Sequence, residues 1–251
     1  IINNLKKGGT IILNRDDKFF KLLLRKAKLK KLKVVSFGYN KKSDIFPLKV
    51  RKNNKNTNVL VKISNKKINL TIKNLNIYNV LSTLALLKVL NVNLIHASKY
   101  FKNIEPTEGR GKIYKIKRYN KNFKLIDESY NANPLSVKNA IENFNLIKKN
   151  NFKKYLILGD MLELGKKSEI LHKDLSKVIN NSDIDKVFVK GIKTLVTYKN
   201  INKGKRGNIF QQEEDIDFNL KNIISNNDYL MIKGSNATGL NNFSKRIIKG
   251  Y

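Results

Sequence analysis

The stretch NFKLIDESYNANP, residues 122–134, determines how the second half of this chain folds. An apolar run ends in acids and amides, and Asn133 followed by Pro134 favours a helix that starts there and runs to Lys149. The same strand-and-helix pattern recurs at KKYLILGDM, KVFVKG, NIFQQ and DYLMIKGS, residues 153–161, 186–191, 208–212 and 228–235. This alternation predicts a mostly parallel sheet of five or six strands with helices on both faces, a Rossmann-like, doubly wound α/β domain.

The first hundred residues have a different pattern. GTIILN (9–14) and KVVSFG (33–38) are apolar runs closed by turn formers, typical of buried parallel strands, and a crossover helix is expected at 16–30. Apolar and polar residues then alternate over 48–74, as in half-exposed antiparallel strands, and helical spacing follows at 76–92. These elements predict a separate α/β region in the first part of the chain.

The segment IEPTEGRGK, residues 104–112, combines Pro, Gly and charge with no apolar period, which indicates a domain boundary. We therefore expect two domains, residues 1–107 and 108–251, each long enough to bury a core. The chain begins without Met and without a signal-peptide pattern, so we interpret its start as a cut inside a longer protein.

The composition excludes several classes of protein. No run approaches the roughly 20 apolar residues of a membrane helix, so we expect no membrane insertion. The chain has no Cys, which excludes disulfides, thiolate metal sites and a Cys nucleophile, and which is compatible with a reducing cytoplasm, the expected location. His96 and His172 are too few and too isolated for a histidine metal cluster, so we expect no metal-binding residue.

The net charge is +33, from 52 Lys and Arg against 19 Asp and Glu. A surplus of this size permits a basic nucleic-acid-binding protein, which would gain affinity by releasing counterions from phosphates. Here the surplus is mostly Lys, spread along the whole chain with abundant Asn and Ile, whereas nucleic-acid binders usually cluster their charge. We therefore expect no specific nucleic-acid partner and keep such a binding protein as the alternative from a different class.

Candidate site residues follow from the rule that ligands of open α/β sheets bind outside the carboxyl ends of the strands. At three strand ends, acids suit a ribose hydroxyl, a hydrated metal or an ammonium group, and a lysine suits a carboxylate or phosphate. They are Asp127, Glu128, Tyr130, Asn131 and Asn133 after the first strand, Asp160 and Glu163 after the second, and Lys233 and Ser235 after the last. Each strand end also has a purely structural alternative. The residues after the first strand can form a helix cap, those after the second a turn whose acids face solvent, and those after the last an ordinary glycine turn.

Arg110, between two glycines, is a candidate phosphate clamp because its guanidinium offers a planar pair of donors, and a plain surface cation is the alternative. Asn14 to Asp17 follow a strand and can serve as a site or as a cap. No GxxxxGK(S/T) phosphate-binding loop occurs in the 251 residues, and GRGK at 109–112 is too short to be one.

Three motifs, taken in order, closely resemble the C-terminal domain of the Mur ligases of the MurF type: LIDESYNANP, LILGDMLELG and LMIKGS, residues 125–134, 156–165 and 230–235. Three further motifs resemble the later part of that family's central ATPase domain and the junction to its third domain: LNRDD, IYNVLSTLALL and GR, residues 13–17, 77–87 and 109–110. The resemblance spans nearly the whole chain. It implies the remainder of a P-loop-type central ATPase domain, without its P-loop, followed by a Rossmann-like C-terminal domain.

The resemblance also implies an activity, the ATP-dependent joining of D-alanyl-D-alanine to UDP-N-acetylmuramoyl-tripeptide through an acyl phosphate. It implies ATP and Mg²⁺ as cofactors, the two substrates as partners, and a monomer. The P-loop and the metal ligands would lie upstream of Ile1, so we expect a truncated C-terminal fragment that is inactive alone. The rivals are another Mur-type ligase and folylpolyglutamate synthase, and the SYNANP and GDMLELG runs argue against both.

The resemblance assigns roles by position. Arg110 matches an arginine that contacts ATP phosphate, and Glu128 beside Asp127 matches a carboxylate that contacts the nucleotide ribose. Lys233 joins Arg110 and Glu128 as the expected catalytic set. The residues expected to face the incoming amino substrate are Tyr130, Asn131, Asn133, Asp160, Glu163 and Ser235.

One further nucleotide contact is implied in the first domain. Asn79 matches the asparagine of the family's His-Asn pair near the nucleotide. Tyr78 replaces the histidine of that pair, and Ser82 stands where relatives often have an adenine-binding asparagine. These two departures leave the adenine contact open.

Overall fold

The computed structural model describes residues 2–53, 56–73 and 75–250. The chain divides into two compact units, Ile1–Pro106 and Thr107–Tyr251. Each unit has a sheet of its own. The resulting mixed α/β architecture with two sheets confirms the predicted fold class. Within the described residues, every helix is too short or too polar to cross a lipid bilayer.

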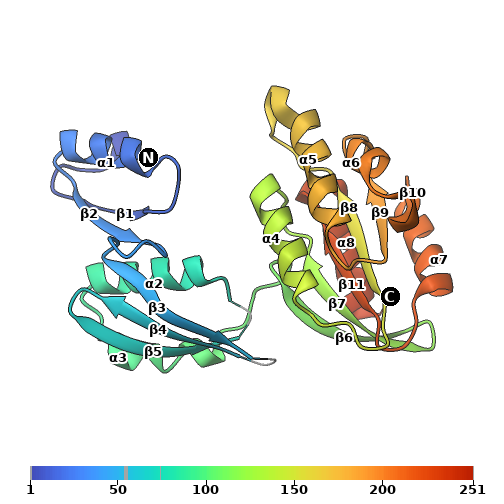
Figure 1. The fold of residues 1–251 in the computed structure, drawn as a ribbon, viewed down its shortest axis with the longest axis horizontal. Coiled ribbons are helices and arrows are strands. Elements are labelled where there is room, and N and C mark those ends of the chain that lie inside the picture. The colour runs from blue at the N-terminus through green and yellow to red at the C-terminus, as the bar shows by residue number, and fades with distance from the viewer. Residues whose placement is uncertain (1, 54–55, 74, 251) are drawn as a thin grey trace. The chain divides into compact units, whose positions relative to one another are not determined.

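The sheet of the first unit has the order β1-β2-β3-β4-β5 (Figure 1). Its strands are β1 (Thr10–Asn14), β2 (Lys33–Phe37), β3 (Ile45–Lys52), β4 (Thr57–Ile63) and β5 (Lys66–Ile72). The pairs β1·β2 and β2·β3 are parallel and the pairs β3·β4 and β4·β5 antiparallel, which follows the change from apolar runs to alternating residues. Asn74, the last residue of the predicted alternating region, lies outside the described residues.

Helices of the first unit are α1 (Phe20–Leu29), α2 (Ile77–Val89) and α3 (Leu94–Ser98), with 3-10 turns η1 (Ile2–Asn4) and η2 (Phe101–Asn103). Helix α1 begins at Phe20 and not at the predicted Asp16, because Asp16 is used elsewhere. Its carboxylate accepts bonds from Tyr39 N at 2.5 Å and Asn40 N at 3.0 Å, which ties the end of β1 to the loop after β2. Asp16 therefore does not cap α1, whose N-cap residue Phe19 has no side-chain cap, and the alternative that Asp16 belongs to a site stays a prediction.

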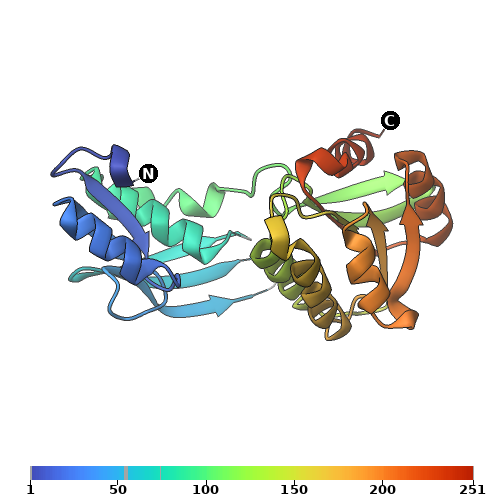
Figure 2. The same ribbon diagram turned by 90° about the horizontal axis from the view of Figure 1, so that it is seen from above.

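Apolar side chains pack against both faces of β1 and β2, and helices lie on either side of these strands (Figure 2). Ile11 packs with the residues of α1, whereas its neighbour Ile12 belongs to the cluster under α2, because successive strand residues point to opposite faces. The face of α2 that enters this cluster consists of Val80, Leu81, Leu84 and Ala85. That spacing follows the helical period and explains why residues 76–92 read as a packed helix from the sequence.

The second unit contains a six-stranded sheet in the order β10-β9-β8-β11-β7-β6. Its strands are β6 (Lys112–Arg118), β7 (Lys121–Glu128), β8 (Lys154–Gly159), β9 (Lys186–Lys190), β10 (Arg206–Phe210) and β11 (Tyr229–Lys233). Its helices are α4 (Pro134–Asn145), α5 (Ser168–Asn180), α6 (Thr194–Asn200), α7 (Glu213–Ile223) and α8 (Leu240–Lys249), with 3-10 turns η3 (Gly165–Lys167), η4 (Lys203–Lys205) and η5 (Asn236–Thr238). Strands β7 to β11 are parallel, and β6 pairs antiparallel with β7.

Helices α4, α5 and α6 cover one face of this sheet, and α7 and α8 cover the other (Figure 1). Strand β8 contributes side chains to both cores. Leu156 and Leu158 belong to the core under α4 and α5, whereas Tyr155 and Ile157 belong to the core under α7 and α8. The predicted doubly wound arrangement is therefore confirmed.

Two details of the second unit differ from the prediction. Strand β6 was not predicted, because KIYKIKR follows directly on the Pro- and Gly-containing boundary; the turn at Tyr119 and Asn120, both with positive φ, makes it a hairpin with β7. Helix α4 ends at Asn145 and not at Lys149. At this end the Phe144 carbonyl accepts a hydrogen bond from Lys154 Nζ at 2.9 Å, and Asn145 Oδ1 accepts one from Asp183 N at 2.8 Å. Tertiary hydrogen bonds therefore replace further helical ones at the end of α4.

Candidate functional site

The predicted site segments of the second unit meet at one edge of its sheet. Strand β7 ends at Glu128, β8 at Gly159 and β11 at Lys233, and β11 lies between the other two. In the parallel register Lys233 is the partner of Glu128 on one side and of Leu158 on the other. Residues distant in sequence are therefore neighbours at the carboxyl edge, where ligands of such sheets bind.

Asp127 is buried at this edge, with 1% of its surface exposed. Its Oδ2 accepts Gly109 N at 2.7 Å, and its Oδ1 accepts Ser129 Oγ at 2.6 Å and Ser129 N at 3.2 Å. Both carboxylate oxygens are thus bound by the chain itself. The loop before β6 is closed further by Tyr130 N, which donates to Gly109 O at 3.1 Å. Asp127 therefore fixes the loop that carries Arg110.

Arg110 lies between two glycines with positive φ, Gly109 and Gly111. A Cβ on Gly109 would lie 2.7 Å from Tyr130 Cβ, so this close approach requires glycine. The Arg110 side chain is exposed, and its guanidinium carbon lies 4.2 Å from the centre of the Tyr130 ring. Stacking on an aromatic ring holds the cation in one direction while leaving its donors open to an anion.

Glu128 and Lys233 form a close pair of opposite charges at this edge. Lys233 Nζ lies 3.4 Å from Glu128 Oε2, with 2% of the lysine side chain and 25% of the glutamate side chain exposed. Burial raises the pKa of the Glu128 carboxyl, and Asp127 adds to that effect, whereas Lys233 and Arg110 oppose it. Burial lowers the pKa of the Lys233 ammonium, and Glu128 opposes that effect. The pair is held by mutual attraction against desolvation.

Asp160 and Ser235 tie three loops of this edge together. Asp160 Oδ1 accepts Thr194 N at 2.8 Å and Thr194 Oγ1 at 3.0 Å, and Gly191 provides the necessary room because a Cβ there would lie 2.4 Å from the carboxyl carbon. Ser235 N donates to Asp160 O at 3.1 Å, and Ser235 Oγ accepts Leu162 N at 3.1 Å. Both residues are buried, so their polar atoms act within the protein. Thr194 and Gly191 were not singled out from the sequence, and only the glycine gave a local signal.

The other substrate candidates differ in how free their side chains are. Asn133 caps α4: its Oδ1 accepts Ser136 N at 2.8 Å, and its own N donates to Ser136 Oγ at 3.0 Å. This is the helix cap considered as the alternative. Tyr130, Asn131 and Glu163 are exposed, and Glu163 has a φ of 62° in the loop after β8. All three face solvent, and Asn131 Oδ1 also accepts Ala132 N at 2.8 Å.

Asn79 belongs to the first unit, on the first turn of α2, and its side chain is exposed. Its carbonyl accepts the hydroxyls of Ser82 at 2.9 Å and Thr83 at 2.8 Å, bonds within the helix that leave the side-chain amide open. The adjacent Tyr78 donates to Asp16 Oδ2 at 3.1 Å. Burial, the Asp16 charge and this bond raise the pKa of Tyr78 to about 12.

The described residues contain no group of three or more His, Asp or Glu side chains placed to hold a metal ion. His172 is buried in α5, where its Nε2 accepts Met161 N at 3.1 Å and its Nδ1 donates to Ser168 O at 2.7 Å. Both ring nitrogens are used, so His172 orients the loop after β8.

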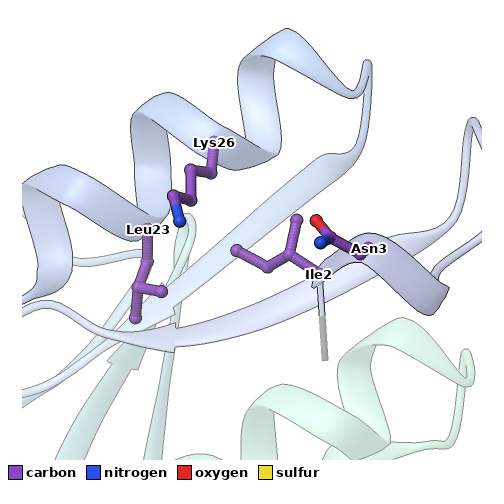
Figure 3. Close-up of a pocket in the computed structure, with 4 residues that line it drawn as sticks. All are labelled: Ile2, Asn3, Leu23 and Lys26. Carbon is purple, nitrogen blue, oxygen red and sulfur yellow. The ribbon is translucent and has the colours of Figure 1, made fainter.

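A shallow groove in the first unit lies between η1 and α1 (Figure 3). It is lined by Ile2, Asn3, Leu23 and Lys26, and the Ile2 side chain points toward Leu23. This lining offers one cation and no acid, base or nucleophile pair, so we assign it no part in the site.

Two family models match the chain. The Mur ligase middle domain matches residues 1–87, and the Mur ligase glutamate ligase domain matches residues 110–236. A curated relative, UDP-N-acetylmuramoyl-tripeptide–D-alanyl-D-alanine ligase of Rickettsia prowazekii, is 28% identical over 244 residues, which cover 96% of this chain and 53% of the relative. The chain thus spans about half the length of the curated relatives it matches.

Two solved structures share the fold of this chain. MurF from Acinetobacter baumannii aligns with a TM-score of 0.80 and 20% identity, covering 99% of this chain and 53% of that one. MurF ligase from Thermotoga maritima in complex with ADP aligns with a TM-score of 0.78 and 19% identity, covering 100% of this chain and 56% of that one. At these identities the likeness concerns the fold alone.

Proposed function

Because the chain belongs to the Mur ligase family, we propose that it serves the ATP-dependent ligation of D-alanyl-D-alanine to UDP-N-acetylmuramoyl-tripeptide. The name of the R. prowazekii relative supports this choice among Mur-type reactions. The observation that carries the proposal is the carboxyl edge of the second sheet. There β7, β8 and β11 bring the motif-bearing segments together, next to an exposed arginine stacked on Tyr130.

Arg110 and Glu128 are the proposed nucleotide contacts in the second unit. Arg110 would bind a phosphate group, because its guanidinium is exposed and oriented by Tyr130. Glu128 would accept a ribose hydroxyl, because its carboxylate keeps some exposure, whereas Asp127 has both oxygens bound within the loop. Asn79, exposed on α2, is the proposed nucleotide contact of the first unit.

The amino substrate is the proposed ligand of the exposed polar side chains at the same edge. Tyr130, Asn131 and Glu163 can reach a bound dipeptide, and the Glu163 carboxylate suits an ammonium group. Asn133, Asp160 and Ser235 would support these loops, because their side chains are hydrogen-bonded to the chain itself.

In the proposed reaction the terminal carboxylate of the tripeptide attacks the γ-phosphorus of ATP, and ADP leaves as the acyl phosphate forms. The amine of D-alanyl-D-alanine then attacks the acyl carbon, phosphate leaves with the bonding electron pair, and the amine releases a proton. Arg110 would stabilise the negative charge on the transferring phosphoryl oxygens.

ATP and Mg²⁺ are the proposed cofactors, and the ADP complex of the T. maritima enzyme supports a nucleotide. Mg²⁺, when bound, would neutralise phosphate charge. The described residues offer no cluster that would hold it, and the sequence has no GxxxxGK(S/T) loop, so we assign the metal no ligand and no step in this chain. A cytoplasmic location and a monomeric state belong to the same proposal.

The test is a titration of the ¹⁵N-labelled chain with ADP and, separately, with D-alanyl-D-alanine, followed by NMR. ADP should shift the amides of residues 109–111 and 128–131, and Arg110→Ala should remove the shifts. Lys117→Ala, an exposed cation on β6, is the matched control and should leave them unchanged. Absence of any shift at millimolar ADP would refute the nucleotide contacts.

The same sample tests the nucleic-acid alternative. A specific binder would hold duplex DNA with an affinity that falls steeply as salt rises, with a slope set by the number of phosphates contacted. Weak association that vanishes near physiological salt is expected from a diffuse charge of +33. Persistent, sequence-dependent binding at that salt concentration would favour the alternative.

A further inference from the structure

Two lysine side chains are almost completely buried in the second sheet, one at each end. Lys154 begins β8 with 0% of its side chain exposed, and Lys233 ends β11 with 2% exposed. Burying an ammonium group is costly unless its charge and its hydrogen bonds are satisfied. Each lysine therefore has a defined set of oxygen partners, and these partners show which segment of the chain the lysine binds.

The Lys233 ammonium lies among oxygen atoms of the connection between β7 and α4. Lys233 Nζ donates to Asn131 O at 2.6 Å and to Glu128 O at 3.2 Å, and it lies 3.4 Å from Glu128 Oε2. A lysine ammonium has three donors and no acceptor. With two hydrogen bonds, a close carboxylate and only 2% of its side chain exposed, this group is turned toward the connection and not toward a ligand in solvent.

The oxygens that bind Lys233 belong to the connection between β7 and α4, which carries the exposed parts of the site. Tyr130 lies between the two anchored residues, and its ring supports the Arg110 guanidinium at 4.2 Å. Tyr130 N also donates to Gly109 O, next to Arg110 in the chain. A displacement of this connection would therefore move Glu128, Tyr130 and Arg110 together.

We propose that Lys233 is a positioning residue, which clamps the β7–α4 connection so that Glu128 and the Arg110–Tyr130 pair face the nucleotide, and which does not itself touch the substrate. This role replaces the catalytic role expected from the sequence. It rests on the proposed function for the identity of the ligand. The clamp itself is defined by contacts inside the second unit.

The test compares Lys233→Met with Lys154→Met in the 251-residue chain. Methionine keeps an unbranched side chain of similar length and removes the charge. Lys154 is the matched control because it is equally buried on the neighbouring strand, where it binds Asp183 and the Phe144 carbonyl at the opposite edge. Both variants should lower the melting temperature, so stability alone does not distinguish the two roles.

Two readouts separate a clamp from a merely structural lysine. In Lys233→Met, the Glu128 carboxyl should titrate at higher pH than in the wild type, because a neighbouring cation is lost while Asp127 and Arg110 remain. The Tyr130 amide should exchange with solvent roughly tenfold faster relative to the strand amides of the same unit. Lys154→Met should change neither quantity. Unchanged Glu128 titration and Tyr130 exchange in a folded Lys233→Met would overturn the proposal.

The wild-type chain provides an independent measurement should Lys233→Met fail to fold. With its protons bound, the Lys233 ammonium should give a slowly exchanging NMR signal, and that signal should shift less on addition of ADP than the Tyr130 amide does. A rapidly exchanging Lys233 ammonium would overturn the clamp. If ADP shifts no signal at all, the proposed function fails, whereas the clamp is still decided by the titration and exchange data, which need no nucleotide.

Discussion

Asp127→Asn removes the charge from a carboxylate that is 1% exposed and accepts three hydrogen bonds. In either orientation, the amide NH₂ group replaces one acceptor oxygen, so it faces the N–H of Gly109 or that of Ser129. At least one buried N–H therefore loses its acceptor, which costs about 1–3 kcal/mol. The remaining bonds also lose the strength that a charged acceptor gives them. Together we expect the unfolding free energy of the second unit to fall by about 2–4 kcal/mol.

The assay is urea unfolding at pH 7, followed through NMR signals of the second-unit strands so that the first unit does not contribute. Asp174→Asn is the control, because Asp174 is 52% exposed and only pairs with Lys177 on the same helix. That change should cost less than about 1 kcal/mol. If Asp127→Asn lies within about 0.5 kcal/mol of the wild type, the carboxylate does not hold the Gly109 loop and the reasoning is refuted.

Three further outcomes are expected. Gly109→Ala should destabilise the second unit by about 2 kcal/mol or more in the same assay, because Gly109 has a φ of 71° and an added Cβ would lie 2.7 Å from Tyr130 Cβ. Gly204→Ala should be nearly neutral, because nothing lies within 4 Å of a Cβ there. Equal effects of the two variants would contradict the close approach of Gly109 to Tyr130. Tyr78 has a pKa raised from 10.0 to about 12, so its contribution to stability is present below pH 10 and is lost as the pH rises toward 12. Between pH 10 and 12, Tyr78→Phe should therefore lose less unfolding free energy than the wild type. An identical loss in the two proteins would argue against the raised pKa of Tyr78. Arg110→Ala should weaken ADP binding about tenfold or more, measured by titration, with Lys117→Ala unchanged, and the reverse ranking would favour a diffuse basic surface.

Local sequence signals predicted most elements of the second unit because each one is decided by neighbours along the chain. The apolar run before Asp127 forms β7, and Asn133 with Pro134 starts α4, since a cap and a fixed φ act within one turn. Strand β6 was missed although its residues alternate, because they follow directly on the Pro- and Gly-containing boundary. Its pairing with β7 through the turn at Tyr119 and Asn120 is visible only in the fold.

The candidate site was only partly predictable for the same physical reason. The sequence indicated which residue types follow each strand, and the rule of the carboxyl edge grouped them. It gave no indication of which acids are free to bind a ligand. Asp127 and Asp160 have carboxylates bound to Gly109 and Thr194, whereas Glu128 keeps part of its carboxylate exposed beside a buried lysine.

The amino-acid sequence by itself determined the family, the two-part α/β architecture and the positions of the motifs, because hydrophobic period, caps and turn residues act over a few neighbours. The tertiary structure alone decided the strand order, in which β11 inserts between β7 and β8, and with it the pairing of Lys233 with Glu128. Such pairings depend on chain closure over long separations and on desolvation, which no local pattern encodes. For this reason a lysine whose position suggested catalysis lies buried among the oxygens of the loop that it holds.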